Sequence, residues 1–378
     1  MITRRILFLV DSLGIGGAER GLVLTLRFLN RDYIDGEVAS LWEPMTLRRD
    51  IEALGIPVHA LESGRGPRAL LQVPRLVRLL RRGRFDAIHT QVVWSSIAGR
   101  IAGRIARVKV ISHVLNADPH GRDQAELPRV TARKAQVVAL LDELTGRFLV
   151  DRFVAISQAA AKNPIRGRSW DRSRFSVVAR GQPLEELARR AAEDPHPAIE
   201  NPGRPSILSV GRLAPQKGHR YLIDAMPKIL AEYPGAVLLI AGDGYSRPVL
   251  EQRARPLGKS VTFLGIRSDV PSLLSRCDVF VFPSLWEGQG NALLEAMAVG
   301  GPIVATRIPA IEETLRHGED AWLVDPANSE ALAEGVLRMM ADPAMAASMA
   351  KRAALASGRF DIHRTTMELE SLYRDVLG

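Results

Sequence analysis

The sequence predicts an α/β protein of two doubly wound domains, each a parallel sheet with helices on both faces. At 378 residues the chain is longer than one ordinary hydrophobic core. Short apolar runs alternate with amphipathic runs, which is typical of parallel sheets with crossover helices. A Pro-rich stretch, residues 194–205, interrupts this pattern, and the pattern then restarts.

In the first half, seven apolar runs predict strands: Ile6–Val10, Val38–Leu41, Val58–Ala60, Ala87–His89, Lys109–His113, Phe153–Ile156 and Phe175–Val178. Helices are predicted over Ala18–Asn30, up to Leu54, after Ala60, over Ser95–Ala106, up to about Phe148 and before Phe175, with a loop at Leu115–Pro128. The first domain is therefore expected over residues 1–194.

Residues 195–205 are the predicted linker, and residues 206–358 form the second predicted domain. Its expected strands are Ile207–Val210, Val237–Ile240, Val261–Leu264, Val279–Phe282, Ile303–Thr306 and Trp322–Val324. Its expected helices are His219–Glu232, Tyr245–Leu257, Val270–Arg276, one beginning near Asn291, and further helices to the end of the chain.

Composition indicates a soluble globular protein, with 25% charged and 46% hydrophobic residues. No apolar run approaches the roughly 20 residues of a membrane span. The first apolar run ends at Asp11 and lacks the pattern of a signal peptide. We therefore expect a cytoplasmic location. Cys277 is the single cysteine, which excludes an intrachain disulfide and favours a packed core thiol.

The first half of the chain is basic. Residues 1–190 contain 32 Lys and Arg against 19 Asp and Glu, and the whole chain has a net charge of +9. Arginines alternate with apolar residues after Ala60, at Arg68, Arg75, Arg78, Arg81, Arg82 and Arg84. This pattern favours either a peripheral contact with anionic lipid at the inner membrane face or an anionic acceptor. The alternative is an amphipathic helix with an Arg-rich solvent side. No nucleic-acid partner is expected, because no aromatic-interleaved basic platform is present.

A loop and helix at Pro283–Met297 carry two carboxylates behind a buried strand. Glu287 precedes two glycines, Gly288 and Gly290, and Glu295 lies eight positions further on. Asn291 is predicted to cap the helix. Because ligands bind at the carboxyl ends of strands in open α/β sheets, the two carboxylates are candidates for two polar parts of one ligand. The alternative is that both are ordinary solvated charges.

Two glycine-rich loops each follow the first strand of a predicted domain. The first contains Gly16 and Gly17 and offers a helix N-terminus to an anion. The second begins at Gly211 and supplies Arg212 and, five residues later, Lys217. Such a pair suits a diphosphate, whereas solvation of both side chains is the alternative. No Asp-x-Asp pair or regularly spaced histidines occur in the sequence, so no metal is expected.

Six segments together resemble a known family. They are V-G-R-L-A-P-Q-K-G-H at 210–219, A-G-D-G at 241–244, E-G-Q-G-N-A-L-L-E-A-M-A at 287–298, G-G-A-E-R at 16–20, A-I-S at 155–157 and V-T-F-L-G at 261–265. The set is similar to family 4 of the retaining glycosyltransferases, which have the GT-B fold. The resemblance implies two Rossmann-like domains facing a central crevice, with the acceptor on the first and a nucleotide sugar on the second. It also implies that residues 359–378 pack back on the first domain.

The resemblance implies a role for each side chain of the second domain. Arg212 and Lys217 hold the diphosphate, Glu287 contacts hydroxyls of the transferred sugar, and Glu295 holds the ribose. The neighbouring loop residues Gly211, Gly288, Gly290 and Asn291 belong to the same donor-binding set. No cofactor is implied, since the nucleotide sugar is a substrate.

In the first domain, the resemblance places the backbone of Gly16 and Gly17 near the diphosphate and His113 near the donor sugar. A structural histidine is the alternative for His113. The sequence departs from the family at Gln289, where Phe is common, and at Arg180-Gly181, where Asn-Gly is common.

The expected activity is metal-independent hexose transfer from a UDP-sugar, or from GDP-mannose, to a glycan, lipid-linked or small-molecule acceptor. A nucleotide-sugar epimerase of the same fold and a non-catalytic nucleotide-sugar-binding protein are the alternatives.

Overall fold

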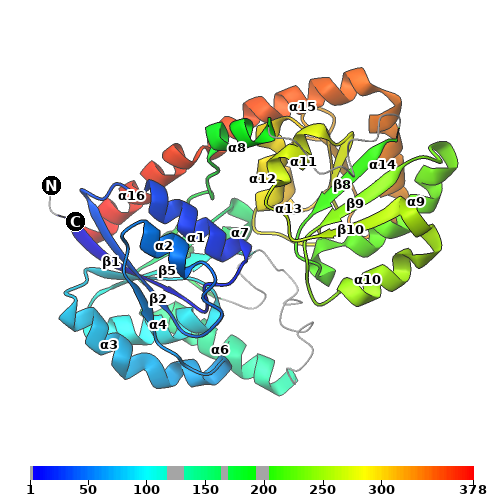
Figure 1. Cartoon of the computed structure of the whole chain (residues 1–378). Coiled ribbons are helices and arrows are strands. Elements are labelled where there is room, and N and C mark those ends of the chain that lie inside the picture. Colours follow the sequence, from blue (N-terminus) through cyan, green and yellow to red (C-terminus); the bar gives the residue numbers. More distant parts are fainter. Residues whose placement is uncertain (1–2, 117–131, 163–168, 193–203) are drawn as a thin grey trace. The chain divides into compact units, whose positions relative to one another are not determined.

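The computed structural model of the chain describes residues 3–116, 132–162, 169–192 and 204–378 (Figure 1). The chain divides into two compact units. Unit 1 comprises Met1–Gly181 and Ile362–Gly378, and unit 2 comprises Gln182–Asp361. The predicted linker, residues 195–205, lies outside the described residues except for its last two, and so does the predicted loop at 115–128 from residue 117 onward.

Unit 1 is built on a parallel sheet with the order β3-β2-β1-β4-β5-β6-β7. Its strands are β1 (Arg4–Val10), β2 (Ile34–Ser40), β3 (Val58–Ala60), β4 (Ala87–Thr90), β5 (Lys109–Val114), β6 (Arg152–Ala155) and β7 (Phe175–Val177). Phe8 of β1 aligns with Val38 on one side and with His89 on the other. Because β1 is central and helices cover both faces, its residues from Ile6 to Val10 are almost completely buried.

The helices of unit 1 are α1 (Gly17–Phe28), α2 (Arg48–Ala53), η1 (Gly66–Gln72), α3 (Val73–Arg82), α4 (Val93–Ala106), α6 (Ala132–Leu149), α7 (Gln158–Lys162), η2 (Arg172–Arg174) and α16 (Ile362–Leu377). The last helix belongs to this unit although it ends the chain. Leu369, Leu372 and Tyr373 of α16 share one hydrophobic core with Phe8 and Val154 of the sheet. The C-terminal helix therefore completes one face of unit 1.

Unit 2 repeats the architecture with the strand order β10-β9-β8-β11-β12-β13. Its strands are β8 (Ser206–Val210), β9 (Val237–Ala241), β10 (Val261–Gly265), β11 (Val279–Phe282), β12 (Ile303–Thr306) and β13 (Trp322–Val324). All pairs are parallel. The carboxyl ends of β8, β9 and β11 therefore meet at one edge of this sheet.

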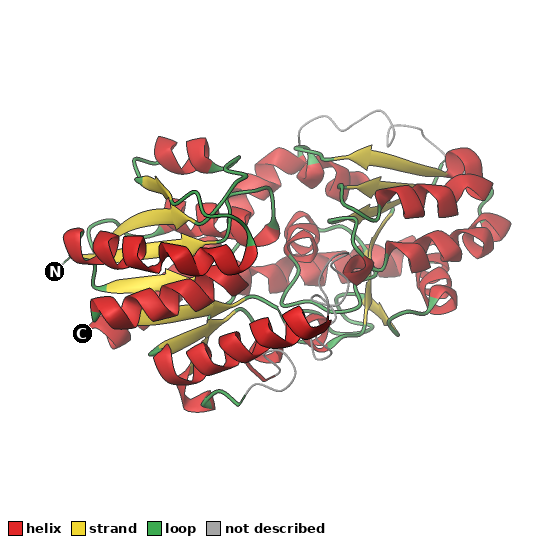
Figure 2. Cartoon of the chain, turned by 90° about the horizontal axis from the view of Figure 1, so that it is seen from below, coloured by secondary structure: helices red, strands yellow, loops and turns green. Residues whose placement is uncertain are grey.

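The helices of unit 2 are α8 (Leu184–Ala191), η3 (Pro215–Lys217), α9 (His219–Glu232), α10 (Arg247–Ala254), η4 (Arg255–Ser260), α11 (Val270–Arg276), α12 (Asn291–Val299), α13 (Pro309–Glu312), α14 (Ser329–Ala341), α15 (Pro343–Ser357) and η5 (Gly358–Phe360). In each unit they lie over both faces of the strands (Figure 2). The predicted α/β fold with two doubly wound sheets is confirmed.

One local prediction is wrong. Asn291 does not cap α12 but is its first residue, and Gly290 occupies the N-cap position with a φ of 91°. A residue with a side chain rarely adopts this conformation, so the chain turns into α12 at a glycine rather than at a capping side chain.

Candidate functional site

The loop after β8 is held against two neighbouring loops of unit 2 through glycines. Gly218 has a φ of 65°, and a Cβ atom there would lie 1.9 Å from the carbonyl oxygen of Pro283. Gly242 has a φ of 134°, and its Cβ would lie 2.0 Å from the carbonyl oxygen of Gly211. Only glycine fits either position. The missing side chains let the loops after β8, β9 and β11 touch at their backbones.

A buried glutamine ties the same loops together by hydrogen bonds. The side-chain amide of Gln216 donates to the carbonyl oxygen of Trp286 at 2.8 Å. In return, the backbone N–H of Leu285 donates to the carbonyl oxygen of Gln216 at 2.7 Å. Because Gln216 is 6% exposed, these bonds are protected from water and fix the position of the next residue, Lys217.

Lys217 and Glu287 form an ion pair in which Glu287 is buried. The hydroxyl of Ser284 also donates to Oε1 of Glu287, at 2.9 Å. The Lys217 ammonium lies 5.4 Å from the centre of the Phe282 ring. A cation and an anion are thus held at the carboxyl ends of β8 and β11 with restricted contact to water. A negative ligand that reaches Lys217 gains an attraction that is only partly screened.

The other predicted residues of unit 2 surround this pair to different degrees. Arg212 is exposed on the same loop as Lys217, and Gly288 is buried beside Glu287. Glu295 and Asn291 are half-buried on α12. The structure therefore brings Lys217 and Glu287 into contact, and it leaves the Arg212 guanidinium facing solvent.

His219, the first residue of α9, was not singled out from the sequence. Its side chain is 2% exposed, and neither ring nitrogen has a hydrogen-bond partner among the described residues. Burial, together with the charge of Lys217, lowers the pKa of His219 to about 3. The imidazole is therefore neutral and leaves the positive charge beside it on Lys217 alone.

In unit 1, the glycine-rich loop after β1 leads directly into α1. Gly16 is the N-cap and Gly17 the first helical residue, with no side-chain cap. A Cβ atom at Gly16 would lie 2.2 Å from a carboxylate oxygen of Glu19. The Glu19 carboxylate therefore lies beside the N-terminus of α1, where the sequence predicts an anion site.

His113 lies on β5, next to His89 of β4. The two rings stack with centroids 5.3 Å apart, and His89 Nδ1 is 2.7 Å from the hydroxyl oxygen of Tyr373 on α16. Neither ring nitrogen of His113 has a partner among the described residues. Burial lowers the pKa of His113 well below its ordinary value, and His89 and Arg180 lower it further. His113 is consequently a neutral imidazole that is free to donate or accept one hydrogen bond.

A small pocket of about 30 Å³ opens beside His113. Its lining residues come from α1, α16 and the carboxyl ends of the strands, and they include Gln91, Arg180 and Thr366. Arg180 also donates from Nη1 to the carbonyl oxygen of Gly17 at 2.7 Å. Arg180, where Asn is common in the family, thus links Gly17 to the pocket beside His113.

A partly buried carboxylate, Asp11, follows β1 at the same edge of the unit 1 sheet. Its Oδ1 accepts a hydrogen bond from the backbone N–H of Ser95 at 2.6 Å. The N-cap residue of α4, Val92, has no side-chain oxygen, so Asp11 caps this helix from the loop after β1. Burial raises the pKa of Asp11 to about 6, although its hydrogen bonds to Ser95 act in the opposite direction.

Sequence reasoning missed Gln216, Ser284, His219 and Asp11, and it noted Arg180 only as a departure. Gln216 lies in the segment 210–219 and Ser284 in the loop that begins at Pro283, and both side chains carry hydrogen-bond donors, which was a usable signal. The burial of His219 and the cap from Asp11 to α4 depend on contacts between distant segments, and no local pattern indicates them.

Within the described ranges, no three His, Cys, Asp or Glu side chains gather closely enough to hold a metal ion. Nor does any helix of the described chain have the length and apolar character needed to cross a bilayer.

Known proteins resemble the chain over most of its length. The UDP-Gal:alpha-D-GlcNAc-diphosphoundecaprenol alpha-1,3-galactosyltransferase of Escherichia coli is 28% identical over 355 residues, covering 92% of this chain and 86% of that protein. The 2-deoxystreptamine glucosyltransferase of Streptomyces kanamyceticus is 27% identical over 323 residues, 80% of each chain. The crystal structure of Anabaena HepE in complex with UDP superimposes with a TM-score of 0.81 at 24% identity, over 98% of this chain and 100% of HepE.

Two family models match adjoining parts of the chain. Residues 15–186 match the model described as Glycosyltransferase Family 4, and residues 204–342 match the model described as Glycosyl transferases group 1. The fold is the GT-B fold of this group. The chain belongs to family 4 of the glycosyltransferases, and it is a glycosyltransferase.

Proposed function

We propose that this enzyme moves a hexose from a nucleotide-diphosphate sugar to an acceptor hydroxyl, with retention of the anomeric configuration and without a metal ion. The observation that carries the proposal is the ion pair of the half-buried Lys217 with the buried Glu287. Two hydrogen bonds of Gln216 hold this pair at the carboxyl edge of the unit 2 sheet. Ligands of open α/β sheets bind at this edge.

In this reaction the bond between the sugar C1 and the diphosphate oxygen breaks, and a bond from C1 to the acceptor oxygen forms. The acceptor proton goes to the departing phosphate oxygen, so charge and atoms balance. Negative charge grows on the diphosphate in the transition state. Lys217 and Arg212 supply fixed positive charge there, and preorganised charge of this kind is usually the largest contribution to catalysis.

The remaining predicted residues take binding roles in this proposal. Glu287 accepts hydrogen bonds from hydroxyls of the transferred sugar, which requires it to share or release Lys217. Glu295 accepts from the ribose, while Gly211, Gly288, Gly290 and Asn291 contact the donor through loop backbone. In unit 1, the N–H groups near Gly16 and Gly17 approach the diphosphate and neutral His113 contacts the sugar.

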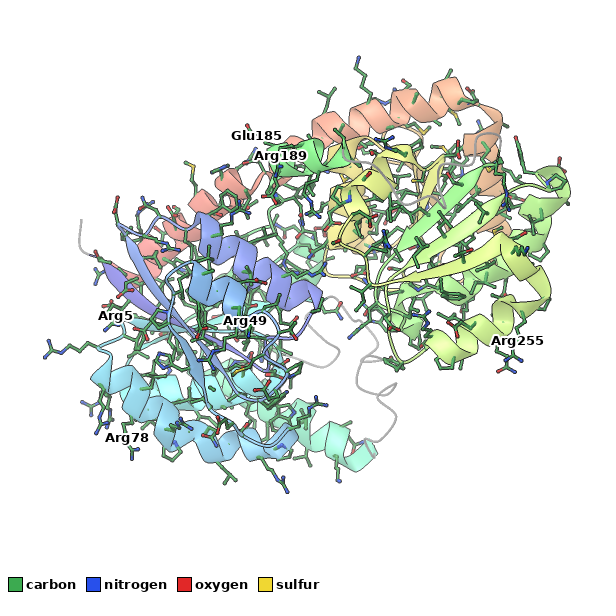
Figure 3. All side chains as sticks on the ribbon, viewed as in Figure 1. Arg5, Arg49, Arg78, Glu185, Arg189 and Arg255 are labelled. Atoms are coloured by element: carbon green, nitrogen blue, oxygen red, sulfur yellow. The ribbon has the colours of Figure 1, made fainter. Side chains whose placement is uncertain are left out.

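We propose a UDP-sugar as the donor, with GDP-mannose as the second choice, and a glycan or lipid-linked acceptor. The name of the Escherichia coli relative states a UDP-galactose donor and a diphosphoundecaprenol-linked acceptor, and HepE was crystallised with UDP. A lipid-linked acceptor agrees with a cytoplasmic enzyme that meets the inner membrane face. The exposed arginines of α3, such as Arg78, point away from unit 1 and are available for that contact (Figure 3).

A panel of UDP- and GDP-sugars in a thermal-shift assay tests the donor, and NMR of the product anomeric proton tests retention. We expect one nucleotide class to raise the melting temperature and transfer to occur equally with and without EDTA. Donor consumption without any acceptor would favour the epimerase, and binding without turnover on any acceptor would favour the binding protein. Activity that EDTA abolishes and Mg²⁺ or Mn²⁺ restores would contradict metal independence.

A further inference from the structure

Ser284 lies in the loop after β11, three residues before Glu287, and its side chain is completely buried. Its hydroxyl donates to Oε1 of Glu287 at 2.9 Å, and the Lys217 ammonium pairs with the same oxygen. The other carboxylate oxygen, Oε2, accepts no hydrogen bond from any described residue. Each oxygen of an ionised carboxylate has about two accepting sites. Oε1 is therefore fully used by the protein, while Oε2 keeps its accepting capacity.

Thr306, the last residue of β12, fixes the backbone that carries Ser284. Its side chain is buried, and its hydroxyl donates to the carbonyl oxygen of Ser284. The ladder between β11 and β12 ends where Phe282 aligns with Ala305. The Ser284 carbonyl lies beyond this ladder, and the Thr306 hydroxyl supplies the partner that a buried carbonyl needs. Because threonine is branched at Cβ and has few rotamers, it restricts the position of this carbonyl.

Lys217 and Ser284 differ in how freely they can leave Glu287. The Lys217 side chain has a flexible four-carbon stem, and it is 18% exposed, against 8% for Glu287. Lys217 is thus the partner that can turn toward an anionic ligand. The short side chain of Ser284 stands on a buried, hydrogen-bonded backbone, so its hydroxyl stays within reach of Oε1. Since a buried carboxylate without any partner is unfavourable, Ser284 prevents that state when Lys217 turns away.

We propose that Ser284 and Thr306 are positioning residues for Glu287. They hold Oε1 while Lys217 turns to the diphosphate, and Oε2 accepts hydrogen bonds from hydroxyls of the transferred sugar. The inference rests on the sugar contact proposed for Glu287, and it adds the residues that orient this carboxylate. Such supporting hydrogen bonds keep a binding group within about 0.5 Å of its productive position. One carboxylate can therefore release its cation in each turnover and remain in place.

A purely structural role of the two hydroxyls is the alternative, because both satisfy buried acceptors next to strand ends. The two roles predict different measurements. Loss of a structural bond lowers the melting temperature and weakens binding of the nucleoside diphosphate and of the whole nucleotide sugar alike. Loss of a positioning bond changes only the steps that involve the sugar, since Glu287 is proposed to contact the sugar and not the nucleotide.

The first test compares Ser284→Ala, Glu287→Ala and the double variant. Steady-state kinetics uses the nucleotide sugar that the panel identifies, and calorimetry measures Kd for its free nucleoside diphosphate, UDP or GDP. We expect Ser284→Ala to lower kcat/KM about tenfold, because a hydrogen bond to a charged group is lost, and to leave Kd for the diphosphate unchanged. In the Glu287→Ala background the same change should add no further loss, because the group that Ser284 positions is absent.

The second test removes the Thr306 hydroxyl and keeps the shape of the side chain in Thr306→Val. We expect kcat/KM to fall about threefold, because the effect passes through the Ser284 backbone. Thr306→Ser keeps the hydroxyl and should restore wild-type kinetics. Thr314→Val is the matched control, since Thr314 is also buried but its hydroxyl donates to the carbonyl oxygen of Ala310. It should lower the melting temperature as Thr306→Val does and leave kcat/KM unchanged.

The variants separate this inference from the proposed function. Wild-type kinetics of Ser284→Ala, together with a loss in Glu287→Ala, would overturn the positioning role and leave the sugar contact of Glu287 standing. Wild-type kinetics of Glu287→Ala would overturn that sugar contact, and the positioning role with it. A further loss when Ser284→Ala is added to Glu287→Ala, or a parallel weakening of diphosphate binding, would overturn the inference in favour of the structural role.

Discussion

The loops that follow β1 and β8 occupy equivalent places in the two units, but the charged side chains that they themselves supply differ in sign. After β8, Arg212 and Lys217 supply two cations, of which Lys217 is held by one buried carboxylate, Glu287. After β1, Asp11 and Glu19 supply carboxylates near the start of α1. Two similar folds therefore carry different charges at equivalent places, and this difference supports our proposal that unit 2 holds the diphosphate.

The two loops also differ in how firmly they are held. The loop after β8 touches neighbouring backbone at Gly218 and Gly242 and is bonded through Gln216 to the loop after β11. The loop after β1 is also bonded through backbone where it begins, since Leu13 exchanges hydrogen bonds with Pro44 and Leu47. Its far end, at Gly17, is held by a long side chain, Arg180. We infer that the loop of unit 2 is preformed throughout, whereas the loop of unit 1 is adjustable at its Gly17 end.

Lys217→Ala should have the largest effect, because it removes the cation that opposes the charge developing on the diphosphate. We expect kcat to fall on the order of 10²–10³-fold. The melting temperature should also fall, because the buried Glu287 loses its cation, so kcat is measured well below the melting temperature of the variant. Steady-state kinetics with the donor found by the panel is the measurement. Arg220→Ala, an exposed arginine three residues away, is the matched control and should behave as wild type. Near-normal activity of Lys217→Ala would show that the cation of the unit 2 loop is not needed for transfer, and it would contradict the role that we propose for Lys217.

Gly218→Ala tests the rigidity of the unit 2 loop. The new methyl group would collide with the Pro283 carbonyl oxygen, in a conformation that already disfavours a side chain, so we expect a loss of about 3 kcal/mol in unfolding free energy. Gly318→Ala is the control, since Gly318 has a φ of 77° but no atom within 4 Å of its Cβ position. It should lose only about 1 kcal/mol. Equal losses of unfolding free energy for the two variants in urea would show that the collision with the Pro283 carbonyl oxygen adds nothing to the cost of a side chain at positive φ.

The sequence predicted which strands and loops carry Lys217 and Glu287 better than it predicted the contacts between them. The apolar runs at Ile6–Val10 and Val279–Phe282 show that both strands are buried, and the position of a loop after such a strand places Lys217 and Glu287 at one sheet edge. Their direct pairing follows from Gly218 and Gln216, whose roles depend on a backbone 65 or more residues away. Asp11 could not be predicted as the cap of α4, because the residue it replaces, Val92, gives no sign of an external partner.

Asp11→Asn should stabilise the protein at neutral pH. This variant tests the contribution of a carboxylate in the loop after β1. The pKa of Asp11 is raised from 3.8 to about 6 in the folded state, so the folded protein binds a proton more tightly than the unfolded chain. Its ionisation therefore lowers stability as pH rises from about 4 through 6. Asn keeps an acceptor for the Ser95 N–H without this penalty, and we expect a gain of about 2 kcal/mol at pH 7 and little change near pH 4.

Urea unfolding of both proteins between pH 4 and 8 measures this difference. Asp342→Asn is the control, because Asp342 caps α15 at an exposed position, and Asn is an equally good cap. If the unfolding free energies of Asp11→Asn and the wild type depend on pH in the same way, the fold does not raise the pKa of Asp11.

Glu295→Ala sharpens the comparison within unit 2, because Glu287 is buried against Lys217 whereas Glu295 is half-buried on α12. A ribose contact has nearly the same strength in the ground state and the transition state, so its loss weakens donor binding without slowing the chemical step. We expect the donor KM to rise about tenfold, equivalent to about 1.4 kcal/mol, at nearly constant kcat. Glu295→Gln keeps one carbonyl acceptor and should lie between the wild type and the alanine variant. A fall in kcat at constant KM would instead show that Glu295 acts in the transition state, as Lys217 does. The proposed division of roles, with Lys217 on the diphosphate and Glu295 on the ribose, would then be wrong.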